Sequence, residues 1–229
     1  MKESMYDKLL KLPLFQGLCE KDFTFILEKI KLNFYKHNER HVIATPKSQC
    51  DKLYFIIDGK VEALYSDDEK RYTIQEYIEG PNVIEPYSLF GMFPHFSATY
   101  TTEDDTNIMT IDKSFIITRL MKFEIFNLNF LNILSNRAQT LYNKILDTKV
   151  NSTEEKIIHF INMRCNFPNG KKIISIKMEV LAEIIDDTRI NVSRALNNFQ
   201  KQGLVQLSRK VITIHDLKAL NDFIENKQN

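Results

Sequence analysis

The spacing of hydrophobic positions changes from helical to alternating and back again along the chain. Residues 1–40, through YDKLLKLPLFQGLCEKDFTFILEKI, place apolar side chains three and four apart, with interruptions at Pro13 and Gly17. This pattern predicts short helices. Between residues 41 and 112 the period becomes two, in short runs such as KLYFII and RYTIQEYI. Loops rich in Gly, Pro, Asp and Asn separate these runs, which predicts short strands folded as a jelly roll, or double-stranded β-helix.

The pair Asp58-Gly59 is the strongest turn signal among these loops. It lies between the runs KLYFII and KVEALY, and a tight primed turn needs the positive φ that Gly, Asp and Asn adopt at low cost. We therefore predict that these two runs form a β-hairpin.

Helical spacing returns from residue 112 to about residue 149. Apolar positions then follow one another alternately three and four apart, at Leu131, Leu134, Ala138, Leu141, Ile145 and Thr148. A seam of this spacing is typical of a helix that packs along a partner helix. We predict a dimerisation helix whose interface is formed by Phe130, Leu134, Ala138, Leu141 and Ile145. The alternative is a core helix that lies along the barrel of the same chain.

The C-terminal segment predicts helices followed by a β-hairpin. A helix restarts with Ser152 at the N-cap position and Glu155 three residues later, which is the spacing of a capping box. After a loop containing Pro168 and Gly170, ISIKMEVLAEII and TRINVSRALNNFQKQG predict two further helices around a turn, and VQLSRKVITI predicts two short strands. This is the element order of a winged helix-turn-helix.

The third of these helices separates apolar from polar side chains. Residues three or four apart share a helical face, and the apolar face holds Val192, Leu196 and Phe199, with Ile185 from before the turn continuing the apolar stripe. The other side carries Arg189, Asn191, Ser193 and Arg194. Thr188 is placed to cap the helix, and Asp186 lies in the turn, where a residue that tolerates left-handed backbone is needed.

This polar face has the chemistry of a helix that reads DNA. Arg can bind guanine O6 and N7, Asn can pair with adenine or a phosphate, and Ser can donate to phosphate oxygens. An exposed amphipathic helix always shows polar residues, so the helix alone fits a solvated surface equally well. The predicted wing that follows it, with Arg209 and Lys210 at its tip, favours DNA.

Hydrophobic content and the distribution of charge support a division into domains. The chain has 229 residues, of which 43% are hydrophobic, enough for real cores. Its formal net charge is +1, yet residues 171–229 hold 10 Lys and Arg against 7 Asp and Glu, while residues 1–150 hold 19 against 21. We expect an α+β fold with a jelly-roll domain at 1–120, the dimerisation helix at 121–149 and the winged helix-turn-helix at 150–229.

The cysteines and the apolar runs bear on where the protein is found. Cys19, Cys50 and Cys165 are odd in number and far apart, which favours reduced thiols over a disulfide framework or a clustered metal site. The sequence shows no charged-then-apolar leader, and no apolar run approaches the roughly 18 residues of a membrane span. We therefore expect a cytoplasmic protein without a membrane partner.

The stretch TRINVSRALNNFQKQGLV resembles the C-terminal helix-turn-helix signature of the Crp/Fnr family of bacterial transcription regulators. In that family the helix reads Arg, a variable residue, Thr or Asn, Val, Ser or Gly, and Arg. The resemblance covers nearly the whole chain, because the family also places a cyclic-nucleotide-binding-like β-roll first and a long dimerisation helix second. It implies a regulator rather than an enzyme, with a sensory β-roll, that binds palindromic double-stranded DNA as a homodimer and has RNA polymerase as a further partner.

By this match, Arg189 and Arg194 are expected to contact bases and phosphates, with Ser193 as a supporting contact. Ile190 departs from the pattern, because many members have Glu there to accept from cytosine, whereas Ile would contact a thymine methyl group. The expected DNA-binding residues are Thr188, Arg189, Ile190, Asn191, Ser193, Arg194, Arg209 and Lys210.

The effector pocket that the resemblance implies departs further from the family. Cyclic-AMP binders show Gly-Glu for the ribose hydroxyl and later Arg-Ser-Ala or Arg-Thr-Ala for the cyclic phosphate. Here Glu85-Pro86 and Phe96-Ser97-Ala98 stand in those places, and the expected pocket is Glu85, Pro86, Tyr87, Phe96 and Ser97. We expect neither cyclic AMP nor an iron–sulfur cluster. The effector is unknown; aromatic residues here favour a flat or hydrophobic ligand, or a pocket filled by its own side chains.

Two other classes of protein are alternatives. The β-roll also resembles cupins, which would make the protein a metalloenzyme, but their metal sites need His-x-His with further ligands. His37 and His41 are four apart and in a strand would be too far apart to share a metal, so two loop or surface histidines are favoured. His95 is a candidate haem ligand beside the expected pocket, although a solvent-facing loop histidine is favoured. The other alternative is a protein-interaction module whose winged helix does not bind DNA.

Overall fold

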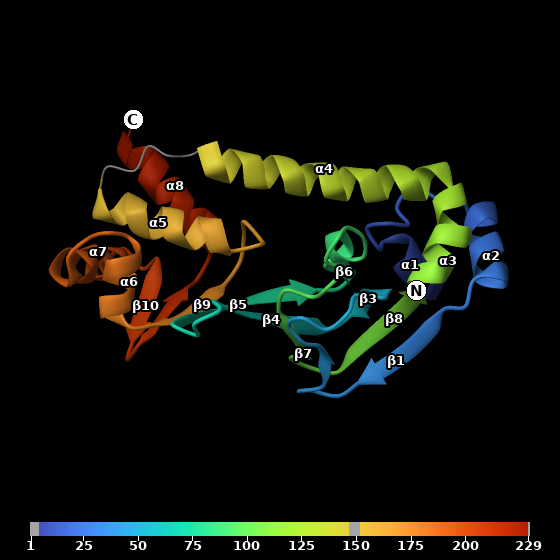
Figure 1. Cartoon of the computed structure of the whole chain (residues 1–229), viewed down its shortest axis with the longest axis horizontal. Helices are drawn as coiled ribbons and strands as arrows, with labels where there is room; N and C mark the ends of the chain where they lie inside the picture. Colours follow the sequence, from blue (N-terminus) through green and yellow to red (C-terminus); the bar gives the residue numbers. More distant parts are fainter. Residues whose placement is uncertain (1–4, 147–151, 229) are drawn as a thin grey trace. The chain divides into compact units, whose positions relative to one another are not determined.

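The alternating segments of the N-terminal half fold into strands of a β-roll (Figure 1). The computed structural model describes residues 5–146 and 152–228. The chain divides into two units, Met1–Ala63 with Ile78–Thr140 and Leu64–Tyr77 with Leu141–Asn229. No helix in the described part of the chain is long and apolar enough to cross a membrane.

The first unit is built on a four-stranded antiparallel sheet of order β1-β8-β3-β6. Its strands are β1 (Asn33–His37), β8 (Thr106–Asp112), β3 (Lys52–Asp58) and β6 (Asn82–Ile84). A second sheet contributes β2 (Val42–Ala44), β7 (Thr99–Thr102) and the first half of β4 (Lys60–Ser66). The short turn η1 (Pro86–Ser88) lies between β6 and β7 in the chain.

Helices of the first unit supply aromatic side chains to its core. They are α1 (Met5–Leu10), α2 (Glu20–Lys29), α3 (Lys113–Thr118) and the 3₁₀ turn η2 (Leu120–Lys122), followed by the start of α4 (Glu124–Leu146). The ring of Phe15 lies 5.6 Å from that of Phe23, 5.3 Å from Phe55 and 5.7 Å from Phe126. Centroid distances in this range are typical of packed aromatic pairs.

The second unit contains the predicted winged helix-turn-helix. It consists of α5 (Thr153–Arg164), β9 (Lys172–Ile176), α6 (Met178–Ile184), α7 (Arg189–Lys201), β10 (Val205–Ser208), β11 (Val211–Ile214) and α8 (Leu217–Gln228). Helices α5 to α8 gather around the strands of this unit (Figure 1). The strand order β10-β11-β9 is extended by β5 (Tyr72–Glu79), which comes from the N-terminal half of the chain.

The sequence pattern identified most elements but misplaced several. Strands β2, β3, β4, β5, β7 and β8, helix α4 and the wing strands confirm the prediction. Strand β1 formed in a segment predicted as helical, and β9 formed where ISIKMEVLAEII predicted only helix. Both are short strands held by antiparallel neighbours, β8 for β1 and β11 and β5 for β9. Pairing with distant strands therefore outweighed the local pattern.

The predicted hairpin at Asp58-Gly59 is wrong. Strand β3 belongs to the four-stranded sheet, whereas β4 belongs to the other sheet, so the two runs are not paired. Gly59 has φ of 95°, and a Cβ there would lie 2.7 Å from the Cα of Thr106. Glycine is thus required for a corner at which the chain leaves one sheet for the other, rather than for a hairpin turn.

The boundaries expected at residues 120 and 149 do not coincide with the two units. The segment Leu64–Tyr77, the distal part of the β4–β5 hairpin, packs in the second unit. Strand β5 pairs with β9 from Tyr72↔Ile176 to Gln75↔Ile173. Ile74, 1% exposed, is a member of the hydrophobic core of the second unit. A strand from the N-terminal half therefore completes the winged-helix sheet.

A buried ion pair holds this strand in place. The Lys172 Nζ atom lies 2.8 Å from Glu76 Oε1, and the two side chains are 1% and 0% exposed. Glu76 also accepts the backbone N–H groups of Asn166 and Phe167, at 2.8 and 3.1 Å, and Lys172 donates to the carbonyl of Asn169 at 2.8 Å. These bonds compensate two charges that could not otherwise stay out of water.

Replacement of Glu76 by Ala is expected to lower the free energy of unfolding by about 3–5 kcal/mol, because it leaves the Lys172 ammonium buried without a counter-charge. Urea unfolding monitored by circular dichroism measures this change. The matched control is Glu79→Ala on the same strand, whose exposed ion pair with Lys60 at 3.3 Å should contribute less than about 1 kcal/mol. Equal effects of the two substitutions would contradict a stabilising role of the buried Glu76–Lys172 pair.

Candidate nucleic-acid interface

Helices α6 and α7 pack through the residues that the sequence pattern selected. Leu181 and Ala182 of α6 are buried, as are Val192, Leu196 and Phe199 of α7. The chain turns between the helices at Asp186, whose φ is 49°, in the left-handed region expected for that position. Burial of one face leaves the opposite face of α7 turned outward.

The first turn of α7 is capped by its own sequence. The Thr188 hydroxyl oxygen accepts the backbone N–H of Asn191 at 3.2 Å, which confirms Thr188 as the N-cap residue. At the start of α5, Ser152 and Glu155 bond each other's backbone N–H groups at 3.2 and 3.0 Å, which confirms the capping box. Helices α5 and α7 therefore have defined first residues.

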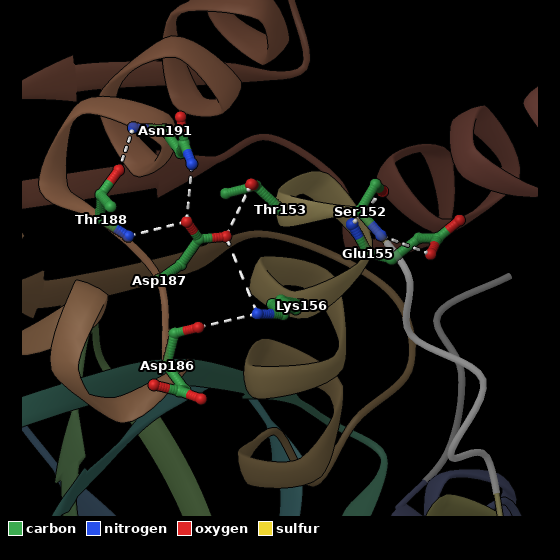
Figure 2. Close-up of polar contacts among 8 residues, drawn as sticks. All are labelled: Ser152, Thr153, Glu155, Lys156, Asp186, Asp187, Thr188 and Asn191. Carbon is green, nitrogen blue, oxygen red and sulfur yellow. Dashed lines mark hydrogen bonds and ion pairs between the residues drawn. The ribbon is translucent and has the colours of Figure 1, made fainter.

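Asp187 fastens the turn between α6 and α7 to helix α5, as Figure 2 shows. One carboxylate oxygen accepts the Thr188 N–H at 2.7 Å and the Asn191 side-chain amide at 2.9 Å. The other accepts the Thr153 hydroxyl at 2.7 Å and lies 3.8 Å from the Lys156 ammonium. We call Asp187, Thr153, Lys156, Thr188 and Asn191 the turn lock. These bonds fix where α7 begins relative to α5.

The turn lock also sets the charge state of its central residue. Hydrogen bonds from Asn191, Thr153 and the Thr188 N–H lower the pKa of Asp187 below its ordinary value of 3.8. Lys156 adds a second link, because its ammonium donates to the backbone carbonyl of Asp186 at 2.7 Å. Sequence reasoning missed Asp187, although an acidic residue directly before an N-cap threonine is a recognisable signal for local bonding to backbone N–H groups.

The residues expected to touch DNA divide into two groups. Exposed side chains on α7 and the wing tip come from Thr188, Arg189, Ile190, Arg194, Arg209 and Lys210. Asn191 is half-buried, and its side-chain amide donates to Asp187, a bond that helps to position the helix. Ser193 is also half-buried, and its carbonyl accepts the amide of Asn197 at 2.8 Å.

A groove separates the start of α6 from the wing. Its volume is about 420 Å³, and its lining includes Lys177, Glu179, Arg189, Arg209 and Lys210 over an apolar floor. A two-residue turn at Arg209 and Lys210 joins β10 to β11, and Lys210 has φ of 63°. The structure thus brings three predicted cations together and adds Lys177 and Glu179, which the helical pattern did not distinguish from ordinary surface residues.

The residues of the expected effector pocket are partly engaged with one another. The Glu85 carboxylate is 4% exposed and accepts the backbone N–H of Ser97 at 3.0 Å, the Ser97 hydroxyl, and the Ser88 hydroxyl at 3.3 Å. Glu85 itself has φ of 39°. Its carboxylate therefore already uses the two donors that Ser97 offers.

Aromatic side chains surround this position. Phe96 is buried, with its ring 5.9 Å from that of Tyr54 and 6.0 Å from that of Tyr100. Pro86 is buried, and Tyr87 carries the Arg137 guanidinium 4.7 Å above its ring. Phe93, by contrast, is 80% exposed and does not line an interior.

His41 is an exposed loop residue, as favoured, but it lies closer to His37 at the end of β1 than their spacing along a strand implied. The rings of His37 and His41 stack 3.8 Å apart with an interplanar angle of 7°, because β1 ends at His37 and the chain turns back before β2. Burial and the neighbouring His41 lower the pKa of His37. His95 is exposed. In the described ranges no three His, Cys, Asp or Glu side chains are grouped to hold a metal.

Helix α4 presents an exposed apolar stripe beyond its first turns. Leu131, Leu141 and Ile145 are 57%, 42% and 64% exposed, while Ala138 is exposed and Leu134 half-buried. Phe130, expected in the same interface, is 4% exposed and lies 5.7 Å from the Phe90 ring, so it belongs to the core of the first unit. Thr148, the last residue of the predicted seam, lies outside the described residues.

All three cysteines carry free thiols, as their number and spacing predicted. Cys19 is exposed, whereas Cys50 and Cys165 are buried. Burial raises the pKa of both buried thiols to about 12, so they remain protonated at neutral pH.

Replacement of Asp187 by Ala is expected to lower the free energy of unfolding by about 2 kcal/mol at neutral pH, because it removes hydrogen bonds to a charged acceptor. The folded-state pKa is below the unfolded one, so this stabilisation is present above about pH 4 and is lost as pH falls through the folded value. Urea unfolding at pH 7 and at pH 3 measures both effects. Asp186→Asn, which retains a residue tolerant of positive φ, should change stability little; a pH-independent Asp187→Ala effect would contradict the turn lock.

Comparison with known proteins finds a matching family model, a sequence relative and a solved structure of similar fold. Residues 155–223 match the family model described as a Crp-like helix-turn-helix domain. The CRP-like cAMP-activated global transcriptional regulator of Mycobacterium tuberculosis is 22% identical over 186 residues, which cover 79% of this chain and 83% of that protein. The Thermus thermophilus catabolite activator protein shares the fold with a TM-score of 0.51 at 17% identity, over 93% of this chain and 99% of that chain. Residues 155–223 therefore form a Crp-like helix-turn-helix domain, in a chain whose fold is similar to that of the catabolite activator protein.

Proposed function

We propose that this Crp/Fnr-type DNA-binding transcriptional regulator binds a palindromic operator as a homodimer, under the control of an effector at its β-roll. The observation that carries the proposal is the exposed basic face formed by the start of α7 and the wing, with α7 held by the turn lock (Figure 2). A recognition helix must be fixed to its domain while its first turns reach base edges. The name of the Mycobacterium tuberculosis relative supports the same class of activity.

The exposed side chains have distinct expected roles at DNA. Arg189 and Arg194 can donate to guanine O6 and N7 in the major groove or to phosphates. Ile190, 64% exposed, can contact a thymine methyl group. Arg209 and Lys210 at the wing tip are placed for backbone phosphates, which set affinity rather than sequence. The half-buried Asn191 acts through the turn lock, by fixing the start of α7.

The exposed stripe of α4 is the proposed dimer interface. Leucine and isoleucine side chains more than 40% exposed on one helix leave apolar area that a second α4 helix could cover. Two-fold symmetry would then present two recognition helices to two half-sites. RNA polymerase is the further partner that this regulator class implies, and the cytoplasm, where bacterial DNA lies, is the implied compartment.

The proposed effector is not cyclic AMP. A cyclic phosphate needs a guanidinium or an equivalent set of donors when it leaves water. Phe96 stands at the position of the family's arginine, and the Ser97 N–H and hydroxyl both donate to Glu85. A phosphate placed there would face a buried carboxylate of the same charge.

In-vitro selection with the full-length protein should enrich an inverted repeat whose half-sites lie about 10 base pairs apart. Arg189→Ala should cost about 1–3 kcal/mol on that site and relax base preference at one position. Lys210→Ala should weaken binding to all sequences alike and reduce the slope of log affinity against log salt by about one. Enrichment of no palindrome would contradict the proposal.

Introduction of Glu at Leu141 should dissociate the dimer, because a charge in the covered seam would lose its water without gaining a partner. Sedimentation at micromolar concentration measures the change, and DNA affinity should fall with it. Asn143→Glu places the same charge on the opposite side of α4 and is the matched control. A Leu141→Glu protein that remains dimeric would show that the seam is elsewhere.

Titration calorimetry with cyclic AMP and cyclic GMP should show no saturable binding at low micromolar concentration, because the donors at Ser97 are occupied by Glu85. Saturable binding of either nucleotide, accompanied by tighter DNA binding, would overturn this part of the proposal. Ser97→Ala should leave both titrations unchanged.

A further inference from the structure

The groove between α6 and the wing contains one negative charge among several positive ones. The charged residues that line it are Lys177, Glu179, Arg189, Arg209 and Lys210. The carboxylate of Glu179 lies 3.2 Å from the guanidinium of Arg189, with the two side chains 60% and 69% exposed. Glu179 is in the first turn of α6, and Arg189 is the first residue of α7. The single acid of the groove thus meets the arginine proposed to read a base.

An exposed ion pair of this kind contributes little to folding. Its position suggests a different role, because a carboxylate offers Arg189 the same chemistry as a DNA phosphate. When non-specific DNA arrives, exchange of Glu179 for a phosphate replaces one anion with another and gains little. At a guanine, the guanidinium can keep Glu179 on one edge and donate to O6 and N7 from another, because it has five N–H donors; operator binding therefore does not give up the ion pair.

We propose that Glu179 is a specificity-determining residue of the DNA interface: it serves as an internal counter-anion of Arg189 and weakens non-specific binding more than operator binding. The inference rests on the proposed DNA-binding function and adds a repulsive element to it. Specificity is a difference between two affinities, and an element that disfavours the wrong partner increases it as well as one that favours the right partner.

The test compares Glu179→Gln with the wild-type chain on two probes, a random-sequence duplex and the palindromic duplex selected with the wild-type protein. We expect affinity for the random duplex to rise about two- to fivefold near 0.1 M salt, the range of an exposed ion pair. The slope of log affinity against log salt should steepen by about one, because Arg189 then neutralises a phosphate. Affinity for the palindrome should change less, so the ratio of the two affinities falls.

Two controls separate the local pair from general charge effects. Glu183→Gln makes the same charge change on the same helix, but Glu183 lies 3.9 Å from Arg71 and does not line the groove; it should leave the affinity ratio unchanged. In an Arg189→Ala background, Glu179→Gln should no longer steepen the salt dependence. An equal gain from Glu183→Gln, or a gain that persists without Arg189, would overturn the inference while the proposed function stands. A wild-type chain that binds no duplex even at low salt would overturn both.

Discussion

The buried ion pair between Glu76 and Lys172 determines how the C-terminal unit is assembled. Both charges are out of water, so each is stable only while the other is opposite it. Glu76 also satisfies two backbone N–H groups in the loop after α5. A slip of β5 by one residue would separate the charges and turn Ile74 away from the core. The register of β5 on β9 is therefore fixed, and a strand of the N-terminal half becomes part of the Crp-like domain.

The turn lock likewise depends on a carboxylate with several partners, on the side of the domain proposed to face DNA. Asp187 receives hydrogen bonds from both α5 and α7, so α7 is fixed at its first turn as well as along its apolar face. The long exposed side chains of α7 and the wing lie outside the turn lock. A helix fixed in this way suits the proposed reading of base edges, because its backbone does not need to be ordered on binding.

Carboxylates of the chain itself meet cationic or hydrogen-bonding groups in both candidate sites. Glu85 accepts the donors of Ser97 in the β-roll, and Glu179 lies against Arg189 in the groove. The Glu85 carboxylate is 4% exposed, although Ser97 lies at the surface, whereas Glu179 and Arg189 are both exposed and accessible to a binding partner. Burial thus separates a closed contact from one that can take part in binding, although the chemistry of the two acids is the same.

The net charge of +1 does not reveal the cluster of cations around the groove. The cations lie close together only because the α6 start, the α7 start and the wing meet around one groove. A local concentration of charge acts on a nearby phosphate, while charges beyond about 10 Å are screened at ordinary salt. The distribution of charge, rather than its sum, is the quantity that matters for the proposed partner.

Local features of the structure were determined by the sequence itself. The Thr188 cap, the left-handed Asp186, the Ser152 capping box and the apolar face of α7 each depend on residues within a few positions of one another. The motif and the alternating runs therefore sufficed for the α+β architecture and for the place of the helix-turn-helix.

Tertiary structure alone decided the features that depend on distant partners. Asp58-Gly59 became a corner because β3 and β4 pair with different neighbours. Phe130 is buried in the core of the first unit, where the Phe90 ring lies beside it. Asn191 donates its amide to Asp187, whose other carboxylate oxygen accepts the hydroxyl of Thr153, 34 residues before Asp187. A sequence pattern reports which face of an element is apolar, but the partner of a polar side chain is chosen only when the folded chain brings the two together.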